Sequence, residues 1–262
     1  MFTTDTLQDK ANRRVYHAAG VTRSYGSQSF DPAEVMIFMR HRDAFVGRDI
    51  LDVGVGTGRT TRCLAPLARR YVAIDYSPVM ISHMRANFPA VAVVEADIAD
   101  LSAFADASFD TVFATNNVVD VLSHARRLQA LAEICRVLKS GGSFIFTTHN
   151  LEYGRQINGP NIEWSLSPVK MVKAALLWLR RQRNHLRIKH LRRIEPEYAL
   201  LNDIGHDFAC LHYYIDPEIQ ARQLAEAGFS LIELVNQQGQ VFMIGAVDIS
   251  NASWLMYVAR KR

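Results

Sequence analysis

The sequence is poor in cysteine and has no long apolar run. Its three cysteines, Cys63, Cys135 and Cys210, lie far apart, include no C-x-x-C pair and are odd in number. A disulfide framework and a cysteine metal site are therefore disfavoured, and since no other metal-ligand cluster stands out, we expect no metal. No stretch of about 18 apolar residues could form a transmembrane helix, and the N-terminus lacks the apolar core of a signal peptide. These absences predict a cytoplasmic protein.

Acidic residues are missing from one segment. Residues 170–193 contain nine Lys or Arg and no Asp or Glu. The whole chain carries a formal charge of +4 and this segment +9, which leaves −5 for the rest. The high isoelectric point therefore belongs to this segment. Because the remainder is acidic and shows no RNA-binding appendage, we expect no nucleic-acid partner.

The chain has 262 residues, of which 49% are hydrophobic. This is enough for one large α/β domain with a full core, or one domain with a small lid. Its most informative stretch is residues 51–58, LDVGVGTG, in which an apolar run is followed by Gly54, Gly56 and Gly58. The pattern predicts a buried strand, a tight turn and a helix N-terminus. Without Cβ atoms in the turn, a ligand can lie against backbone N–H groups, as a nucleoside-type cofactor requires.

The glycine spacing decides between cofactors. The dinucleotide pattern G-x-G-x-x-G would need a third glycine at Arg59 or Thr61, so an NAD-dependent dehydrogenase is disfavoured. The observed G-x-G-x-G, with Asp52 two residues before the first glycine, resembles the first motif of class I S-adenosylmethionine-dependent methyltransferases. Two later strings resemble the same family: SFDTVF at 108–113, and EICRVLKSGG at 133–142, where Ser140 replaces the usual proline.

The resemblance implies an α/β, Rossmann-like fold. We expect a seven-stranded, mostly parallel sheet with an antiparallel last strand and helices on both faces. The cofactor domain is predicted over 48–150 and 214–262, with an N-terminal helical cap over 1–47 and a helical lid over 151–213, inserted after strand five. The first helix of the domain is predicted at about 58–69.

The cofactor implied by the resemblance is S-adenosyl-L-methionine. The first motif contributes Asp52 and the three glycines of the turn. Asp75 ends the predicted second strand, at about the spacing where a carboxylate accepts hydrogen bonds from ribose hydroxyls. Residues 75–80 resemble the family run D-x-S-x-x-M, which implies that Tyr76 and Met80 pack near the adenine, although Met80 is equally typical of ordinary core.

Further cofactor contacts are implied along the chain. The string EADI at 95–98 resembles the next family motif, so Asp97 would meet the adenine amino group and Ile98 would back the ring; Asp97 is also a candidate helix N-cap. Asn116 follows strand four on the ligand side of the sheet and is expected near the sulfonium. An N-terminal segment often covers the cofactor in this family, which makes Tyr25 a candidate; surface packing is the alternative.

A catalytic base is needed only for a poor nucleophile such as a sugar hydroxyl, since the methyl group of a sulfonium is already activated. His149 is the first candidate because it ends strand five facing the ligand crevice. His212 is the second, and Asp120 and His124, just past strand four, are further candidates. For each of the polar and aromatic groups around His212, packing against the core is the competing interpretation.

The basic segment 170–193 lies in the lid and leaves several interpretations open. The first interpretation is a lid helix with a solvated basic face. The second is a helix at an anionic membrane surface, whose interface would be entered by Leu176, Leu177, Trp178 and Leu179. The third is a site for a phosphorylated substrate. The favoured function is methyl transfer to an O or N atom of a small molecule, sugar or glycan precursor. The alternatives are a lipid or quinone methyltransferase at the membrane and a cofactor-binding module without activity.

Overall fold

The computed structural model describes residues 4–17, 29–245 and 249–262. Its central sheet confirms the expected fold. Five parallel strands run in the order β3-β2-β1-β4-β5, and β10 joins β5 antiparallel and carries β9 at its outer edge. These seven strands are β1 Asp49–Val53, β2 Arg70–Asp75, β3 Ala92–Glu95, β4 Phe109–Ala114, β5 Leu138–Asn150, β9 Phe229–Asn236 and β10 Trp254–Lys261.

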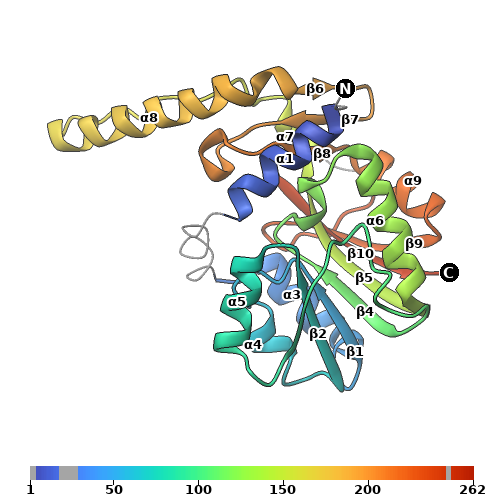
Figure 1. Ribbon diagram of the computed structural model, residues 1–262. Helices are drawn as coiled ribbons and strands as arrows, with labels where there is room; N and C mark the ends of the chain where they lie inside the picture. The colour runs from blue at the N-terminus through green and yellow to red at the C-terminus, as the bar shows by residue number, and fades with distance from the viewer. Residues whose placement is uncertain (1–3, 18–28, 246–248) are drawn as a thin grey trace.

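Helices cover both faces of this sheet (Figure 1). Helices α3 Pro32–Arg40, α4 Thr61–Leu64 and α5 Pro78–Asn87, with the 3₁₀ helix η1 Arg42–Ala44, share one apolar cluster with the strands. Helices α6 His124–Val137 and α9 Pro217–Glu226 pack into the other cluster. Neighbouring strand residues alternate between the clusters: Phe144 and Phe146 face α6 and α9, whereas Ile145 faces the opposite side.

Helix α4 is shorter than predicted. It covers Thr61–Leu64 and not about 58–69. The turn that follows β1 extends to Gly58, whose N–H donates to the carbonyl of Val55, and Pro66 follows soon after the last helical residue. Because proline has no N–H and clashes with the preceding turn of a helix, the regular helix ends before it.

The segment after β5 contains strands as well as helices. It begins with α7 Leu151–Gly154 and α8 Pro168–Ile188, followed by η3 Lys189–Leu191, β6 Arg193–Ile194, β7 Tyr198–Leu201, η4 Gly205–Phe208 and β8 His212–Ile215. Strands β6, β7 and β8 are antiparallel, and β8 pairs in parallel with the last two residues of β5. The sheet thus has ten strands, and the predicted boundary at 213/214 falls inside β8.

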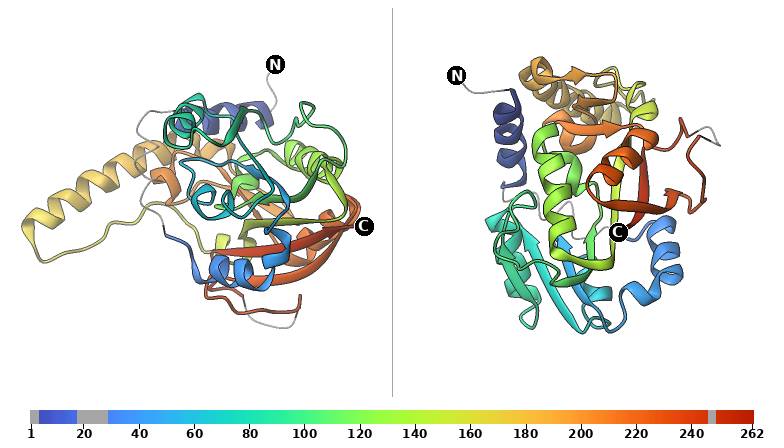
Figure 2. Two further views of the ribbon diagram at one scale, coloured as in Figure 1. Left: turned by 90° about the horizontal axis from the view of Figure 1, so that it is seen from below. Right: turned by 90° about the vertical axis from the view of Figure 1, so that its right-hand side faces the viewer.

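Helix α8 projects beyond the body of the protein (Figures 1 and 2). The indole Nε1 of Trp178 donates to the carbonyl of Pro160 at 3.2 Å, so the polar edge of this half-buried ring faces the preceding segment. Leu177 is also partly buried, whereas Leu176 and Leu179 are exposed. No helix of the described residues is long and apolar enough to cross a membrane.

The N-terminal helix α1 Thr4–Tyr16 is fixed to both halves of the protein. The amide of the buried Asn12 donates to the carbonyls of Val121 and Leu211, each at 2.8 Å, and its oxygen accepts from the N–H of Leu211 at 2.9 Å. Val121 ends the 3₁₀ helix η2 Val118–Val121 after β4, and Leu211 precedes β8. One side chain therefore joins the cap, the core domain and the inserted segment.

Candidate functional site

The glycine turn after β1 brings the backbone close to its neighbours. Gly54 and Gly56 have φ of +64° and +56°, which other residues rarely adopt. A Cβ at Gly54 would lie 2.6 Å from the side chain of Val118, so only glycine fits there. The N–H of Gly56 donates to Oδ2 of Asp75 at 3.0 Å, which ties the turn to the end of the neighbouring strand β2.

A pocket of about 720 Å³ opens beside this turn. Seven of the predicted cofactor residues line it: Asp52, Gly54, Gly56, Asp75, Tyr76, Met80 and Asn116. Asn116 lines it from the end of β4, and Tyr16 of α1 lines it from the cap. Met80 is only 3% exposed and belongs to α5, so both of its predicted roles, core and pocket wall, apply.

A second pocket of about 450 Å³ adjoins the first and shares Gly54, Asp75 and Tyr76 with it. The predicted residues Asp97 and Ile98 line this pocket. Asp97 forms ion pairs with Arg13 of α1 and with Arg126 of α6, and it accepts from the N–H of Ala99 at 3.0 Å. Arg13 and Arg126 also line this pocket, and the Arg13–Asp97 pair attaches α1 to the core.

Burial changes the acidity of two carboxyl groups in the first pocket. Burial raises the pKa of Asp52 to about 6, although hydrogen bonds from Thr60 and Tyr71 oppose this shift. Burial also raises the pKa of Asp75, against the N–H donors of Ser77 at 2.8 Å and Gly56 at 3.0 Å. Both side chains lie where strands end at the ligand crevice of a parallel sheet.

Sequence reasoning missed one ion pair at the pocket. Arg59 lines the pocket, and its guanidinium binds the buried carboxylate of Glu34 through two bonds of 2.6 and 2.7 Å. Glu34 also accepts from the N–H of Asp31, as a helix-capping residue does. From the sequence, Arg59 stood out only as the position of a missing glycine, and Glu34 was not among the candidates. No local sequence pattern indicated that these two residues form an ion pair.

Two predicted cofactor residues do not line the pockets found among the described residues. Gly58 packs against α5: a Cβ there would lie 2.4 Å from the ring of Phe88 and 2.8 Å from the sulfur of Met84. Its φ of +80° and this close approach explain the glycine through packing. Tyr25 lies outside the described residues, whereas Tyr16 of α1 is a tyrosine of the cap that does line the pocket.

Beyond Asn116, the predicted bases His149 and Asp120 form a pair. Nδ1 of His149 lies 2.7 Å from Oδ2 of Asp120, and the same oxygen accepts the backbone N–H of His149 at 2.7 Å. The other oxygen of Asp120 accepts from the buried guanidinium of Arg127 at 2.6 Å. Because the carboxylate is an acceptor, we assign the proton of the imidazole to Nδ1, which leaves a lone pair on Nε2. Asn117 Nδ2 lies 3.1 Å from this Nε2.

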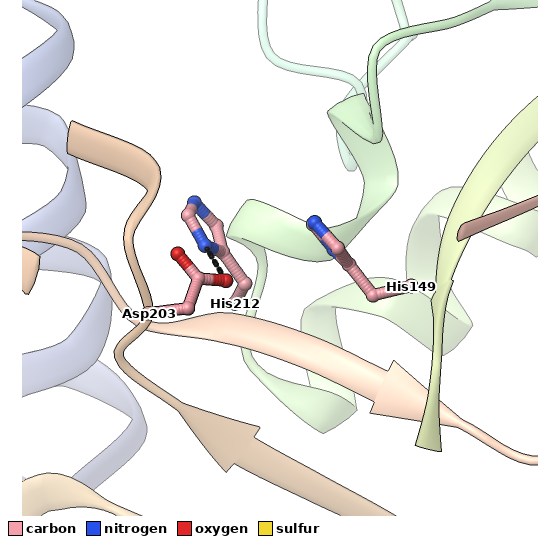
Figure 3. A group of neighbouring side chains, drawn as sticks. All are labelled: His149, Asp203 and His212. Carbon is pink, nitrogen blue, oxygen red and sulfur yellow. Dashed lines mark hydrogen bonds and ion pairs between the residues drawn. The ribbon is translucent and has the colours of Figure 1, made fainter. Parts of the chain in front are cut away.

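A second aspartate–histidine pair lies against the first (Figure 3). Nδ1 of His212 is 2.9 Å from Oδ2 of Asp203, which also accepts the hydroxyl of Tyr214. The rings of His149 and His212 stack with centroids 5.2 Å apart. Burial opposes protonation of His212, but the charge of Asp203 outweighs it and raises the pKa of His212. Burial alone would likewise raise the pKa of Asp203, yet His212 holds it far below its usual range.

A strained loop connects this cluster to the cofactor pocket. His206, Asp207 and Phe208 of η4 all have positive φ, between +49° and +63°, which is costly for residues other than glycine. The ring of His206 lies 4.8 Å from that of Tyr16 and 6.4 Å from that of His212. Burial and the nearby charge of His212 lower the pKa of His206 to about 4. Strained backbone of this kind is often found at binding sites.

His149, Asp203 and His212 also make a set of potential metal ligands, which the sequence analysis did not foresee. Their ligand atoms all lie within 4.8 Å of one another. Two ligands bonded to one metal ion at about 2.1 Å each can be at most about 4.2 Å apart, so the side chains would have to draw together. The arrangement in the structure is that of two aspartate–histidine pairs.

His124 takes no part in this cluster. Its Nδ1 lies 2.7 Å from the hydroxyl of Tyr213, and its ring stacks on Tyr198 at 4.4 Å. His124 therefore packs against these two tyrosines. His212 is both buried and placed in the cluster, so packing and a functional position coincide there.

Comparisons with known proteins agree with this geometry. Residues 51–146 match a family described as "Methyltransferase domain". A probable S-adenosylmethionine-dependent methyltransferase of Mycolicibacterium smegmatis is 32% identical over 115 residues, 44% of this chain and 43% of that protein. A demethylmenaquinone methyltransferase of Clavibacter sepedonicus is 30% identical over 194 residues, 71% of this chain and 67% of that protein. The match to the first of these thus spans less than half of its length.

A solved structure resembles the whole chain. The 1,6-didemethyltoxoflavin-N1-methyltransferase of Burkholderia thailandensis, with bound 1,6-didemethyltoxoflavin and S-adenosylhomocysteine, aligns with a TM-score of 0.62. The alignment covers 100% of this chain and 92% of that chain at 14% identity, which shows a common fold. The glycine turn, the acidic strand end and these matches define an S-adenosylmethionine-binding protein of Rossmann-like fold. The chain belongs to the class I S-adenosylmethionine-dependent methyltransferases.

The pockets fit the cofactor of this family. A nucleoside in the second pocket would lie beside Asp97 and Ile98, and its ribose would reach Asp75, which lines both pockets. The remainder of the cofactor would extend along the glycine turn toward Asn116 and Tyr16. In this order the methyl group would lie at the end of the pocket that adjoins the histidine cluster.

Proposed function

We propose that this protein transfers the methyl group of S-adenosylmethionine to an O or N atom of a small molecule, sugar or glycan precursor. The proposal rests on the His149–Asp120 pair, which contacts the residue next to Asn116 of the pocket wall. Asn116 lines the cofactor pocket, and its neighbour Asn117 contacts Nε2 of His149 at 3.1 Å. The candidate base therefore borders the end of the pocket where the methyl group is expected.

The cofactor supplies a methyl group activated on a sulfonium, so the chain has to align the acceptor and accept its proton. The acceptor would displace Asn117 Nδ2 from Nε2 of His149, and Nε2 would then take the proton while Asp120 holds the ring through Nδ1 and stabilises the imidazolium. The buried Oδ1 of Asn117 has no hydrogen-bond partner among the described residues. An O–H or N–H of the acceptor would satisfy it. An amine acceptor would need no strong base, and His149 would then only shape the site.

The test combines labelled S-adenosylmethionine with an extract of the source organism, followed by partition between organic and aqueous phases. We expect label in an aqueous small-molecule fraction. His149→Gln should lower the rate roughly 100-fold or more and leave cofactor binding unchanged in calorimetry. His190→Gln, at an exposed position, is the matched control. Cofactor binding with no labelled product from any fraction would refute methyl transfer and favour a binding module.

A second candidate function is methylation of a lipid or quinone at a membrane surface. Helix α8 favours it, because Leu176 and Leu179 are exposed beside a run of basic residues. The similarity to a demethylmenaquinone methyltransferase points the same way. Label in the organic phase of the same experiment would select this candidate over a soluble acceptor.

A further inference from the structure

Helix α8 exposes a continuous apolar stripe. Val169, Val172, Leu176 and Leu179 are each 56–66% exposed. Their spacing of three, four and three residues places them on one side of the helix. Leu166 and Trp164, just before the helix, are 104% and 83% exposed. A row of large apolar side chains in water is unusual on a monomeric protein and marks a contact surface.

The opposite side of α8 is already occupied. Trp178 bonds to Pro160, and the Nδ2 of Asn184 donates to the carbonyl of Asp207 at 3.0 Å. The guanidinium groups of Arg180 and Arg181 pair with the carboxylate of Asp207. The base of the helix is thus attached to the protein, and the apolar stripe is turned outward. The views of the fold agree, since α8 stands clear of the sheet (Figure 2).

The charges on α8 itself all have one sign. Lys170, Lys173, Arg183 and Arg187 form no ion pair within the described part of the chain, and α8 contains no acidic residue. The helix has 21 residues, so it extends for about 30 Å. An apolar stripe flanked by cations on one long helix is the combination that binds at the interface of an anionic bilayer.

We propose that the outward face of α8 docks on an anionic lipid bilayer. The charge pattern disfavours a second copy of this chain as the occupant. Two α8 helices paired through the stripe would bring together Arg183 and Arg187 of both copies, which share the side of Leu176 and Leu179, with no acidic residue on either helix to compensate. At the surface of an anionic bilayer, the headgroups would pair with the cations while the leucine side chains enter the apolar layer. This proposal concerns docking alone and does not depend on the methyl acceptor.

Flotation of the full-length protein with vesicles tests the proposal. We expect it to float with phosphatidylcholine vesicles that contain about 30% phosphatidylglycerol, much less with pure phosphatidylcholine, and less in high salt, which screens the charges. Leu176→Gln with Leu179→Gln should lower binding about tenfold or more. Lys170→Gln with Lys173→Gln should lower it about fivefold for each cation removed.

Leu128→Gln is the matched control, because Leu128 is an exposed leucine on α6. It should bind vesicles like the unchanged protein, and all variants should bind S-adenosylmethionine normally. No flotation with anionic vesicles overturns the proposal. Flotation that is weakened by neither of the two α8 variants would also overturn the proposal. Loss of a dimer in the Leu176/Leu179 variant without any vesicle binding would assign the stripe to a second copy instead. Flotation needs no methyl acceptor, so its failure is distinct from a failure of the proposed function.

Discussion

Removing the charge of Arg127 should destabilise the protein through Asp120. Arg127 and Asp120 both have side chains with 0% exposure and lie 2.6 Å apart. Arg127 also donates to Thr148 at 3.0 Å and to Gln220, and it lies 4.6 Å from the ring centre of Tyr213. In Arg127→Met the volume is similar, but the fully buried Asp120 carboxylate loses its counter-charge. Breaking such a buried pair costs about 3–5 kcal/mol.

The measurement is urea unfolding followed by tryptophan fluorescence, with bound S-adenosylmethionine as a check on the fold. The double variant Arg127→Met with Asp120→Asn keeps an oxygen for the His149 N–H and removes the uncompensated charge. The double variant should therefore lose about 2 kcal/mol less free energy of unfolding than the sum of the losses in the two single variants. A single-variant loss below 1 kcal/mol, or additive losses, would show that Asp120 does not depend on Arg127 for its charge.

Three further predictions address other parts of the site. The pKa of His206 is about 4 in the folded protein and about 6.5 in the unfolded chain, so the folded state binds fewer protons between these values. The free energy of unfolding therefore decreases as the pH falls from about 6.5 to 4. His206→Asn should therefore gain about 2–3 kcal/mol relative to the unchanged protein between pH 7 and pH 4.5 in urea titrations; an equal difference at both pH values would contradict this. Asp75→Asn should weaken S-adenosylmethionine binding roughly 10- to 100-fold by calorimetry, since a charged acceptor for ribose hydroxyls is lost, and unchanged affinity would count against the assigned pocket. Gly58→Ala should lower stability by about 2 kcal/mol or more, because its Cβ would meet the Phe88 ring at 2.4 Å; a neutral effect would show that the ring moves freely.

The sequence allowed a prediction for the cofactor half of the site because that half is local. Each residue involved lies at the end of a strand or just after it, and the carboxyl ends of parallel strands meet at one edge of the sheet. Asp52, Asp75 and Asn116 could therefore be placed beside one another before any tertiary contact was known. The side of His149 could be predicted for the same reason, since it is the next-to-last residue of β5.

The other half depends on contacts that no local pattern encodes. Asp203 and His212 come from the inserted segment, where β8 returns to pair with the end of β5 and sets Tyr214 opposite His149. The sequence indicated a helical lid there and left the residues around His212 between a strand and a loop. Glu34 and Arg59 meet across 25 residues for a similar reason, because α3 packs on the turn that follows β1. Pairing between distant segments decides both contacts.

The inserted segment and the cofactor pocket meet at the η4 loop. Asp207 in this loop is held by Arg180, Arg181 and Asn184 of α8, while the neighbouring His206 packs on Tyr16 of the cap. Positive φ at non-glycine residues costs about 1–3 kcal/mol each, and the contacts with α8 are among those that offset this strain. A change at the base of α8 should thus reach His206 and the acceptor side without touching the glycine turn. Asp207→Asn is then expected to alter methyl transfer while the affinity for S-adenosylmethionine stays the same, which makes acceptor choice and cofactor binding separable properties of this chain.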